Sequence, residues 1–364
     1  MARKVFSLLP ALCLCFGLAA CSGKDDVPDF VRERTDEAFA RYSDWKGGEK
    51  TVCFALISDV HVDQVRRTYI PHLHYDLYAA ERFGCDFSIN LGDIWNSSAL
   101  RPGDADTILA ATREEMLSYD GVCLYAPGNH DFDAGCRRHI SADTLTHELQ
   151  KPMLSRAGRR LHLATNCYGY YDMPRKRTRA IFLNSNATET RGGSYYTYGA
   201  QQLEWLDSTL RSTRRGWNTV VFSHYAPHPM GAWAGSPVSE DSTIAGLRNI
   251  LAGYAADIDG SWPRGGEGSQ RRGSSARGDG GLVGLFCGDS HWSAYTREDG
   301  VNYYITQGMG GSPESARNEL SRVVPTDFGS EMLLDIVAFK PATREVGIFR
   351  IGRDAAAQDC FFNY

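Results

Sequence analysis

The chain has 364 residues, of which 42% are hydrophobic and 23% charged, a composition typical of a globular protein with a sizeable core. This length allows one large domain or two small ones. The formal net charge of −5 gives no electrostatic footprint for nucleic acid, which requires a clustered basic face, so a nuclease or other nucleic-acid-binding protein is disfavoured.

The N-terminus is expected to be separate from the folded domain. Two basic residues precede an apolar stretch, residues 5–18, that is too short to span a bilayer and is typical of a signal peptide. It ends in "LAAC", which resembles the lipobox of bacterial lipoproteins, in which Cys21 would be acylated. We therefore expect a signal peptide at 1–20 and a tether and lead-in at 21–50. The alternative is ordinary cleavage after small residues, with Cys21 incidental.

This interpretation predicts a location in the bacterial cell envelope. The protein would be lipid-anchored in the outer membrane, on the periplasmic side or at the cell surface, and would touch the membrane only through its N-terminal lipid. The sequence does not predict an oligomeric state.

The cysteines after Cys21 do not suggest a disulfide framework, because seven remain and an odd number cannot all pair. Cys53, Cys123 and Cys287 lie in apolar strand-like runs, where cysteine usually behaves as a small buried hydrophobe. The sequence contains no C-x-x-C pair, which argues against a cysteine-bound zinc ion.

Apolar runs alternate with helical patterns in the first half of the chain. The run "TVCFALISD" is almost continuously apolar, as in a strand covered on both faces. A helix follows, with Pro71 in its first turn and Gly84 at its end. The next elements are a strand at 85–93, a helix at 104–119 and a strand at 121–128. This alternation predicts βαβ units and a mostly parallel sheet.

The second half is richer in strands. We expect an amphipathic helix at 199–216, because three leucines share one face and basic residues fill its last turn. The stretch 259–281 is dense in Gly, Ser and Arg without periodicity, which predicts an exposed mobile loop. The remaining predicted elements are strands, at 179–185, 194–199, 217–224, 281–289, 302–307, 331–339 and 345–351.

Five of the strand-like runs end in polar residues. These are Asp59 and His61, then Asp93, then Asn129, His130 and Asp131, then His224, and finally Asp289 and His291. In α/β sheets the ligand crevice lies beyond the carboxyl ends of the strands, so five such ends can converge. Carboxylate, imidazole and amide groups together suit divalent ions such as Mn, Fe or Zn, and a carboxylate such as Asp93 can bridge two of them.

Taken together, the motifs resemble those of the calcineurin-like metallophosphoesterases. The family pattern is D-x-H, then G-D, then G-N-H-D or G-N-H-E, then a histidine, then G-H-x-H. The chain shows Asp59-Val60-His61, Gly92-Asp93, Gly128-Asn129-His130-Asp131, His224 and Gly288-Asp289-Ser290-His291. Each motif matches except the first histidine of the last one.

The resemblance implies a fold, a domain and a reaction. The fold would be α/β, a four-layer α/β/β/α sandwich of two mixed β-sheets flanked by helices. The domain would span 51–351, with 352–364 as a C-terminal tail. The reaction would be hydrolysis of a small phosphorylated substrate, a phosphomonoester or phosphodiester, by a hydroxide activated between two metal ions.

The resemblance also implies a role for each motif residue. Asp59, His61 and His291 would hold the first metal, Asn129 and His224 the second, and Asp93 would bridge the two. His130 would face the phosphate, and Asp131 would orient the His130 ring. Asp289 stands where the family has a second-metal histidine.

Three outcomes of the exchange at residue 289 stay open. A carboxylate ligand would favour Mn, Fe(II) or Mg over Zn at the second position, and its extra negative charge would disfavour a dianionic monoester relative to a diester. Alternatively, Asp289 does not bind metal and the site is mononuclear or weak. A third hypothesis is a non-catalytic surface lipoprotein that keeps the fold and binds a ligand.

Other polar and aromatic side chains carry weaker signals. His72 and His74 lie two residues apart in a predicted helix and point apart, which favours packing or solvent contact. His228 follows the expected ligand His224 and is a pocket or loop residue. Tyr195, Tyr196 and Tyr198 alternate like strand residues, so they either wall a substrate groove or pack in the core.

Overall fold

The computed structural model describes residues 27–61, 70–95, 103–133, 139–187, 196–229, 242–256, 280–308, 333–352 and 359–364. The predicted lipidation site at Cys21, and the expected loop 259–281 except for its last two residues, lie outside these ranges. No helix in the described part of the chain is long and apolar enough to cross a membrane.

One six-stranded sheet contains the first three strands of the chain. Its order is β13-β12-β11-β1-β2-β3, in which β1, β2 and β3 are parallel and β11 runs antiparallel to β1. The strands are β1 (Val52–Ile57), β2 (Phe87–Asn90), β3 (Cys123–Tyr125), β11 (Leu333–Lys340), β12 (Glu345–Gly352) and β13 (Cys360–Asn363).

A second sheet has seven strands in the order β4-β5-β6-β7-β8-β10-β9. Its centre is parallel, from β6 through β7 and β8 to β10, and its edges are antiparallel. The strands are β4 (Leu161–Leu163), β5 (Gly169–Met173), β6 (Thr178–Phe182), β7 (Asn218–Phe222), β8 (Leu282–Cys287), β9 (Ala294–Glu298) and β10 (Val301–Ile305).

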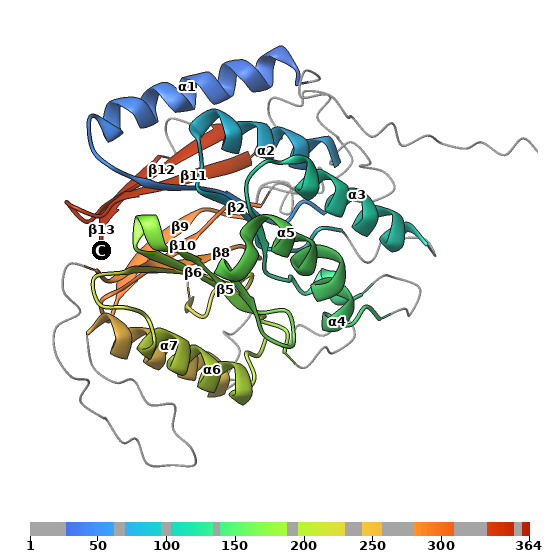
Figure 1. Cartoon of the computed structure of the whole chain (residues 1–364), viewed down its shortest axis with the longest axis vertical. Helices are drawn as coiled ribbons and strands as arrows, with labels where there is room; N and C mark the ends of the chain where they lie inside the picture. Colours follow the sequence, from blue (N-terminus) through green and yellow to red (C-terminus); the bar gives the residue numbers. More distant parts are fainter. Residues whose placement is uncertain are drawn as a thin grey trace, which may run out of the picture.

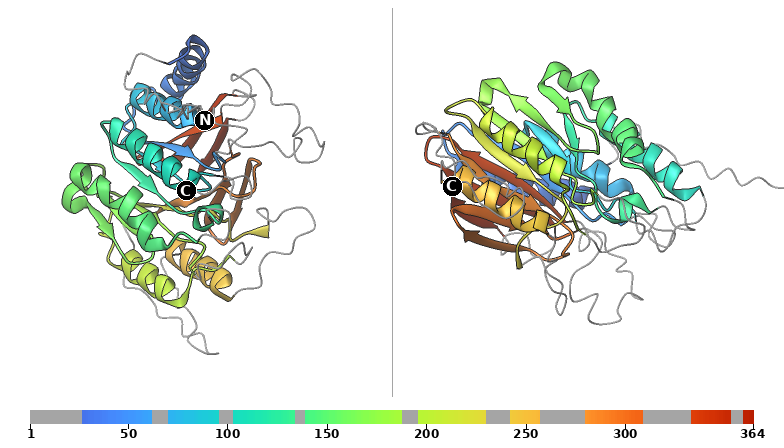
Figure 2. Two further views of the ribbon diagram at one scale, coloured as in Figure 1. Left: turned by 90° about the vertical axis from the view of Figure 1, so that its right-hand side faces the viewer. Right: turned by 90° about the horizontal axis from the view of Figure 1, so that it is seen from below.

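Helices cover the outer faces of both sheets. In Figure 1, α1, α2 and α3 lie beside the first sheet, and α6 and α7 lie beside the second, so that the layers run helix, sheet, sheet, helix. Figure 2 shows the same layers in two perpendicular views. The α-helices are α1 (Asp29–Lys46), α2 (Ile70–Phe83), α3 (Asp104–Ser118), α4 (Ala142–Leu145), α5 (Leu154–Ala157), α6 (Ala200–Arg211) and α7 (Ser242–Ala255). The short 3₁₀ or π helices are η3 (His130–Phe132), η4 (Thr146–Gln150), η5 (Lys151–Met153), η6 (Gly158–Arg160) and η7 (Pro174–Lys176). The predicted four-layer α/β fold is confirmed.

Aromatic side chains fill the space between the two sheets. Phe54 of β1 stacks on Phe87 of β2 with ring centroids 5.0 Å apart. The rings of Phe222 and Phe286, from the second sheet, lie edge-to-face with that of Phe54, with ring centroids 5.2 and 5.5 Å from the Phe54 centroid. Because helices cover the outer faces and the two sheets pack on each other, strands such as β1, β7 and β8 are buried on both sides, which explains their unbroken hydrophobic runs.

Three parts of the chain differ from the sequence predictions. The prediction of a strand at 194–199 is wrong for the described residues 196–199. Thr197 makes only an isolated bridge to Asn186 before α6 begins. Helix α1 occupies most of the expected lead-in and packs on β12. Strand β13 lies in the expected C-terminal tail and pairs with β12, so the first sheet extends beyond residue 351.

A buried ion pair links the two sheets. The guanidinium of Arg350 on β12 donates to both carboxylate oxygens of Asp335 on β11, at 2.9 and 3.0 Å. The hydroxyls of Tyr304 and Thr306, from the end of β10, donate to the same carboxylate at 2.7 and 2.6 Å. One carboxylate on β11 therefore joins the first sheet to β10 of the second.

Replacing Arg350 by methionine is expected to lower the free energy of unfolding by roughly 3–5 kcal/mol, because the substitution leaves a buried carboxylate without its cation. Urea unfolding followed by circular dichroism measures the change. Arg211→Met is the matched control, because Arg211 pairs with Asp207 at the surface of α6 and should lose less than about 1 kcal/mol. Equal losses in the two variants would contradict the prediction.

Candidate metal centre

The predicted site residues follow the carboxyl ends of five parallel-running strands. Asp59 and His61 follow β1, Asp93 follows β2, and Asn129 and His130 follow β3. In the second sheet, His224 follows β7, and Asp289 and His291 follow β8. The ends of the two sheets meet, because His224 lies beside Asp93 and Asn129, and His291 lies beside Asp59.

The backbone is left-handed at most of these residues. The φ angles are positive, between 49° and 66°, at Asp59, His61, Asp93, Asp289 and His291. Left-handed non-glycine residues cost conformational energy and are concentrated at functional sites. The first two loops hold each other in this shape, because the amide of Asp59 donates to the carbonyl of Gly92 at 2.9 Å and that of His61 to the carbonyl of Asp93 at 3.0 Å.

Two of the motif glycines are required by close packing. A Cβ atom on Gly128 would lie 2.1 Å from Oδ1 of Asp93, and one on Gly288 would lie 1.9 Å from Oγ of Ser58. Any larger residue would therefore displace the loops that carry the site. The glycines of the sequence motifs bring the strand ends close together.

One half of the centre is formed by Asp59, His61 and His291. The Nε2 atoms of the two histidines face each other at 3.0 Å, and Nε2 of His291 lies 3.3 Å from Oδ1 of Asp59. Nε2 of His61 lies 3.7 Å from the same oxygen. These three groups form a cluster in which each residue offers one ligand atom to a common point.

The other half surrounds His224. The Nδ1–H of His224 donates to the carbonyl of Leu91 at 2.8 Å, which directs Nε2 into the centre. There Nε2 lies 3.2 Å from Oδ1 of Asn129 and 3.3 Å from Oδ2 of Asp93. His224 is completely buried.

Asp93 lies between the two halves. Its Oδ2 is 3.8 Å from Nε2 of His61 on one side and 3.3 Å from Nε2 of His224 on the other. Its Oδ1 accepts a hydrogen bond from the backbone amide of His130 at 2.8 Å, which fixes the carboxylate plane. Asp93 has the position that a bridging ligand requires.

Asp289 points into the second half. Its Oδ1 lies 3.4 Å from Nε2 of His224, and it accepts a hydrogen bond from the hydroxyl of Tyr196 at 2.6 Å. Its backbone amide donates to Oδ2 of Asp59 at 3.1 Å. Sequence reasoning did not assign Tyr196 to this residue, because the two are 93 positions apart and only the fold joins them.

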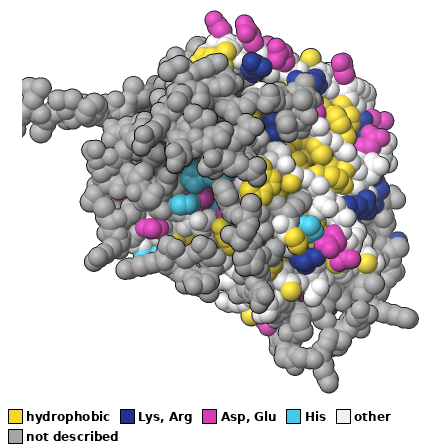
Figure 3. Space-filling model, turned by 180° about the vertical axis from the view of Figure 1, so that it is seen from behind, with side chains coloured by type: hydrophobic (Ala, Val, Ile, Leu, Met, Phe, Trp, Pro, Cys, Tyr) yellow, Lys and Arg dark blue, Asp and Glu magenta, His cyan; other side chains and the backbone are white. Residues whose placement is uncertain are grey.

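His130 lies at the open side of the centre. Its side chain is 32% exposed, compared with 10% for His61 and 0% for His224. Its Nε2 is 4.0 Å from Oδ2 of Asp93. Figure 3, the view from behind, shows histidine side chains next to acidic ones.

Asp131 joins the loops after β2 and β3. Its carboxylate is buried and accepts hydrogen bonds from the backbone amides of Asp93, Gly128 and Ile94, and from the hydroxyl of Tyr125. These four bonds hold the loops after β2 and β3 together. These bonds show that Asp131 supports the loops, and the expected orientation of the His130 ring by Asp131 stays a prediction.

Replacing Asp131 by alanine is expected to lower the free energy of unfolding by roughly 3–5 kcal/mol, because several buried donors lose their shared acceptor. Chemical unfolding of the purified protein measures this loss. A variant whose stability falls by less than about 1 kcal/mol would show that the loops do not depend on Asp131.

The electrostatics of the centre favour cations. Burial alone would lower the pKa of His224, but the carboxylates of Asp93 and Asp289 raise it well above its ordinary value. Burial alone would raise the pKa of Asp59, yet His291 and His224 hold it below its ordinary value. The carboxylates of Asp59 and Asp93, whose pKa values are both lowered, thus remain ionised and attract positive charge.

The donor atoms fit divalent metal ions. Oδ1 of Asp59 and Oδ2 of Asp289 are buried and, among the described residues, have no hydrogen-bond partner. Unsatisfied buried carboxylate oxygens are costly unless another group binds them. Two facing imidazole nitrogens beside them complete a donor set of oxygen and nitrogen that suits Mn, Fe or Zn.

The weaker candidates lie apart from these clusters. His72 is buried in α2, and burial lowers its pKa to about 4. His74 pairs with Glu115 at 3.2 Å, and His228 pairs with Glu298 at 2.9 Å. Tyr198 is a core residue whose hydroxyl bonds Ser223, and Tyr195 lies outside the described residues.

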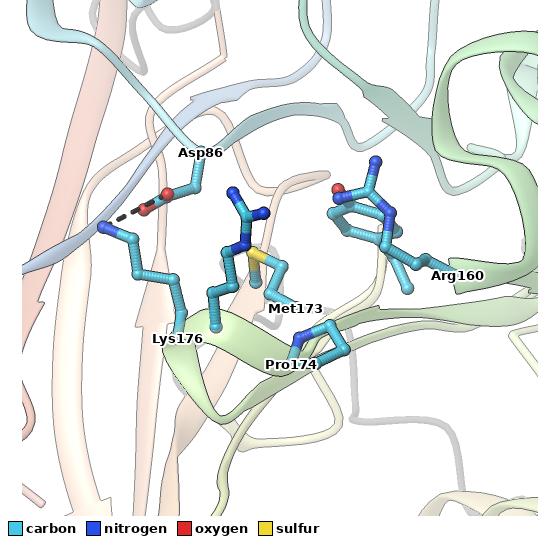
Figure 4. Close-up of a pocket in the computed structure, with 7 residues that line it drawn as sticks. Asp86, Arg160, Met173, Pro174 and Lys176 are labelled. Atoms are coloured by element: carbon cyan, nitrogen blue, oxygen red, sulfur yellow. Dashed lines mark ion pairs between the residues drawn. The ribbon is translucent and has the colours of Figure 1, made fainter.

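A separate cavity of about 650 Å³ lies away from the metal centre. Asp86 in its lining directly precedes β2, whereas the predicted ligand Asp93 follows β2, so the cavity lies at the other end of this strand. Figure 4 shows Lys176 paired with Asp86 across it, at 3.3 Å. Its lining residues are Asp86, Arg160, Tyr171, Met173, Pro174, Arg175 and Lys176, none of which was predicted as a ligand.

Comparison with solved structures identifies the fold. The chain superposes on a dimetal phosphatase from Danio rerio with a TM-score of 0.59 and 15% sequence identity, covering 86% of this chain and 99% of that one. Two further similar structures have lower TM-scores. GAP50, described as the anchor in the inner membrane complex of Plasmodium, has a TM-score of 0.46 and 8% identity, covering 86% of this chain and 89% of that one. TT1561 of Thermus thermophilus has a TM-score of 0.44 and 10% identity, covering 86% of this chain and 99% of that one. No family model and no curated protein matches the sequence.

Proposed function

We propose that this chain is a calcineurin-like metallophosphoesterase that hydrolyses phosphate esters with two divalent metal ions. The observation that carries the proposal is the meeting of ligand side chains from five strand ends, with Oδ2 of Asp93 3.8 Å from Nε2 of His61 and 3.3 Å from Nε2 of His224. The fold likeness to a dimetal phosphatase supports it. Among the described residues, Oδ1 of Asp59 and Oδ2 of Asp289 are buried without a hydrogen-bond partner, which supports metal binding at the site.

In this proposal each half of the centre holds one of the two metal ions. Asp59, His61 and His291 hold the first, and Asn129 and His224 hold the second, with Asp93 between them. Divalent ions at such a centre polarise a phosphoryl oxygen and supply a nucleophile derived from water at neutral pH.

His130 acts on the substrate rather than on the metals. It is the most exposed histidine of the centre, and its imidazole can donate to a phosphoryl oxygen or give a proton to the leaving oxygen. The backbone bond from His130 to Asp93 sets its distance from the bridging carboxylate. Its ring therefore meets a substrate that enters from the open side.

The charge of the centre points to a substrate class. Three carboxylates, those of Asp59, Asp93 and Asp289, are buried at the site. Their negative charge disfavours a dianionic monoester more than a monoanionic diester. We therefore propose a small phosphodiester as the preferred substrate, and Mn or Fe(II) as the preferred metal at the second position.

Hydrolysis assays on the full chain test this function. The protein is stripped with a chelator, reconstituted with Mn²⁺, Fe²⁺ or Zn²⁺, and given an aryl phosphate monoester or diester. We expect turnover only after metal is restored, with the diester and Mn²⁺ or Fe²⁺ the best combination. Absence of turnover with every metal would refute the proposed hydrolase activity. A preference for Zn²⁺ and the monoester would refute the proposed specificity.

For location, we propose that Cys21 carries lipid and anchors the protein in the bacterial envelope. The support is the "LAAC" sequence after an apolar N-terminal stretch. Metabolic labelling with a fatty-acid analogue should mark the wild-type protein, and Cys21→Ser should remove the label. Labelling that survives this substitution would contradict the proposal.

A further inference from the structure

The hydroxyl of Tyr196 makes the shortest contact recorded for the Asp289 carboxylate. It donates to Oδ1 at 2.6 Å, and the same oxygen lies 3.4 Å from Nε2 of His224. The other oxygen, Oδ2, is buried and has no hydrogen-bond partner among the described residues. The phenol therefore fixes Oδ1, the carboxylate oxygen that lies beside Nε2 of His224.

The Tyr196 ring is itself held in place. It stacks on the ring of Tyr225, with centroids 3.7 Å apart and an interplanar angle of 8°. Ser185 ties both segments together, because its carbonyl accepts from the amide of Thr197 at 2.9 Å and its hydroxyl accepts from the amide of Tyr225 at 3.3 Å. Since Tyr225 directly follows His224, the phenol is fixed relative to the second half of the centre.

A neutral donor is the kind of partner that Asp289 requires. Its carboxylate lies near His224 together with that of Asp93, and the two like charges repel. An arginine or lysine partner would cancel the charge and compete with a metal ion. A tyrosine hydroxyl holds the carboxylate in one orientation and leaves its negative charge for a cation.

We propose that Tyr196 is a positioning residue that makes Asp289 a ligand of the second metal ion. The inference rests on the proposed dinuclear centre and deepens it. Held by Tyr196, Asp289 joins Asp93, Asn129 and His224, so that three of the four side chains around this ion offer oxygen. Oxygen-rich donor sets favour Mn²⁺ or Mg²⁺, which gives the second position its metal preference.

Metal binding by the full chain tests the role of Tyr196 without an activity assay. The stripped protein is dialysed against graded Mn²⁺ or Zn²⁺, and bound metal is counted by elemental analysis. The wild-type protein should bind two ions. Tyr196→Phe should weaken the affinity for the second Mn²⁺ ion by roughly 10–100-fold and leave the affinity for the first unchanged. A loss of this size is the usual effect of removing a hydrogen-bond partner of a metal ligand.

Two further variants separate positioning from stability. Tyr42→Phe removes another buried tyrosine hydroxyl, bonded to Thr51 at 2.9 Å before β1, and should leave both affinities unchanged. In an Asp289→Ala background, Tyr196→Phe should have no further effect on the second ion, because the carboxylate on which it acts is absent. Circular dichroism verifies that each variant is folded.

The outcomes distinguish this inference from the function on which it rests. A wild-type chain that binds fewer than two ions would overturn the dinuclear centre, and the role of Tyr196 with it. A wild-type chain that binds two ions, with an unchanged second affinity in folded Tyr196→Phe, would overturn only the role of Tyr196. Equal weakening of both ions would also overturn it, because a general structural effect does not select one half.

Discussion

Asp93→Asn is expected to abolish binding of the two metal ions and to reduce kcat/KM by roughly 10³-fold. Bound metal supplies several kcal/mol of transition-state stabilisation, and about 1.4 kcal/mol corresponds to a factor of ten in rate. The amide has nearly the shape of the carboxylate and can still accept from the amide of His130. Its NH₂ group, however, would face the point that the two halves share. Dialysis with elemental analysis and a diester assay measure both effects.

Asp207→Asn is the matched control for this substitution. Asp207 lies on α6, where it pairs with Arg211 at the surface, so its loss should change neither metal content nor turnover. Retention of two tightly bound ions in Asp93→Asn would show that Asp93 does not bridge.

His130→Ala is expected to lower kcat by roughly 10²–10⁴-fold, the usual contribution of a positioned acid–base group, and to leave the metal content at two ions. His130 is the exposed histidine of the centre, whereas the proposed ligands beside it are more deeply buried. The combination of lost turnover with retained metal separates a group that meets substrate from a ligand. Steady-state kinetics and elemental analysis on the same preparation provide both values.

His147→Ala controls for the loss of an imidazole, because the His147 side chain is 69% exposed and bonds only its neighbour Glu148 among the recorded contacts. Its activity should match the wild type. If His130→Ala lost its metals along with its activity, His130 would be a ligand and its assigned role would be wrong.

The sequence was most informative where one local signal determined the structure. Continuous apolar runs predicted the buried strands β1, β7 and β8, because a strand covered on both faces needs no polar alternation. Polar residues directly after those runs predicted which side chains would meet, because parallel strands end at one edge. Both inferences need only neighbouring residues and a sheet.

The sequence was least informative where a contact joins distant segments. Asp131 is part of a motif next to His130, yet its bonds go to the backbone of the loops after β2 and β3. The alternating tyrosines at 194–199 suggested a strand, but Tyr196 instead contacts Asp289. Helix α1 has a weak apolar face and becomes ordered by packing on β12, which no local pattern reveals.

The most direct test of the account is a crystal structure of the Mn²⁺-loaded protein with anomalous scattering recorded for the metal. The account predicts two anomalous peaks roughly 3.5–4 Å apart, as in other two-metal sites. Asp93 should lie between them, with Asp59, His61 and His291 around one and Asn129, His224 and Asp289 around the other. A single peak, or peaks that avoid these side chains, would contradict the two-metal centre.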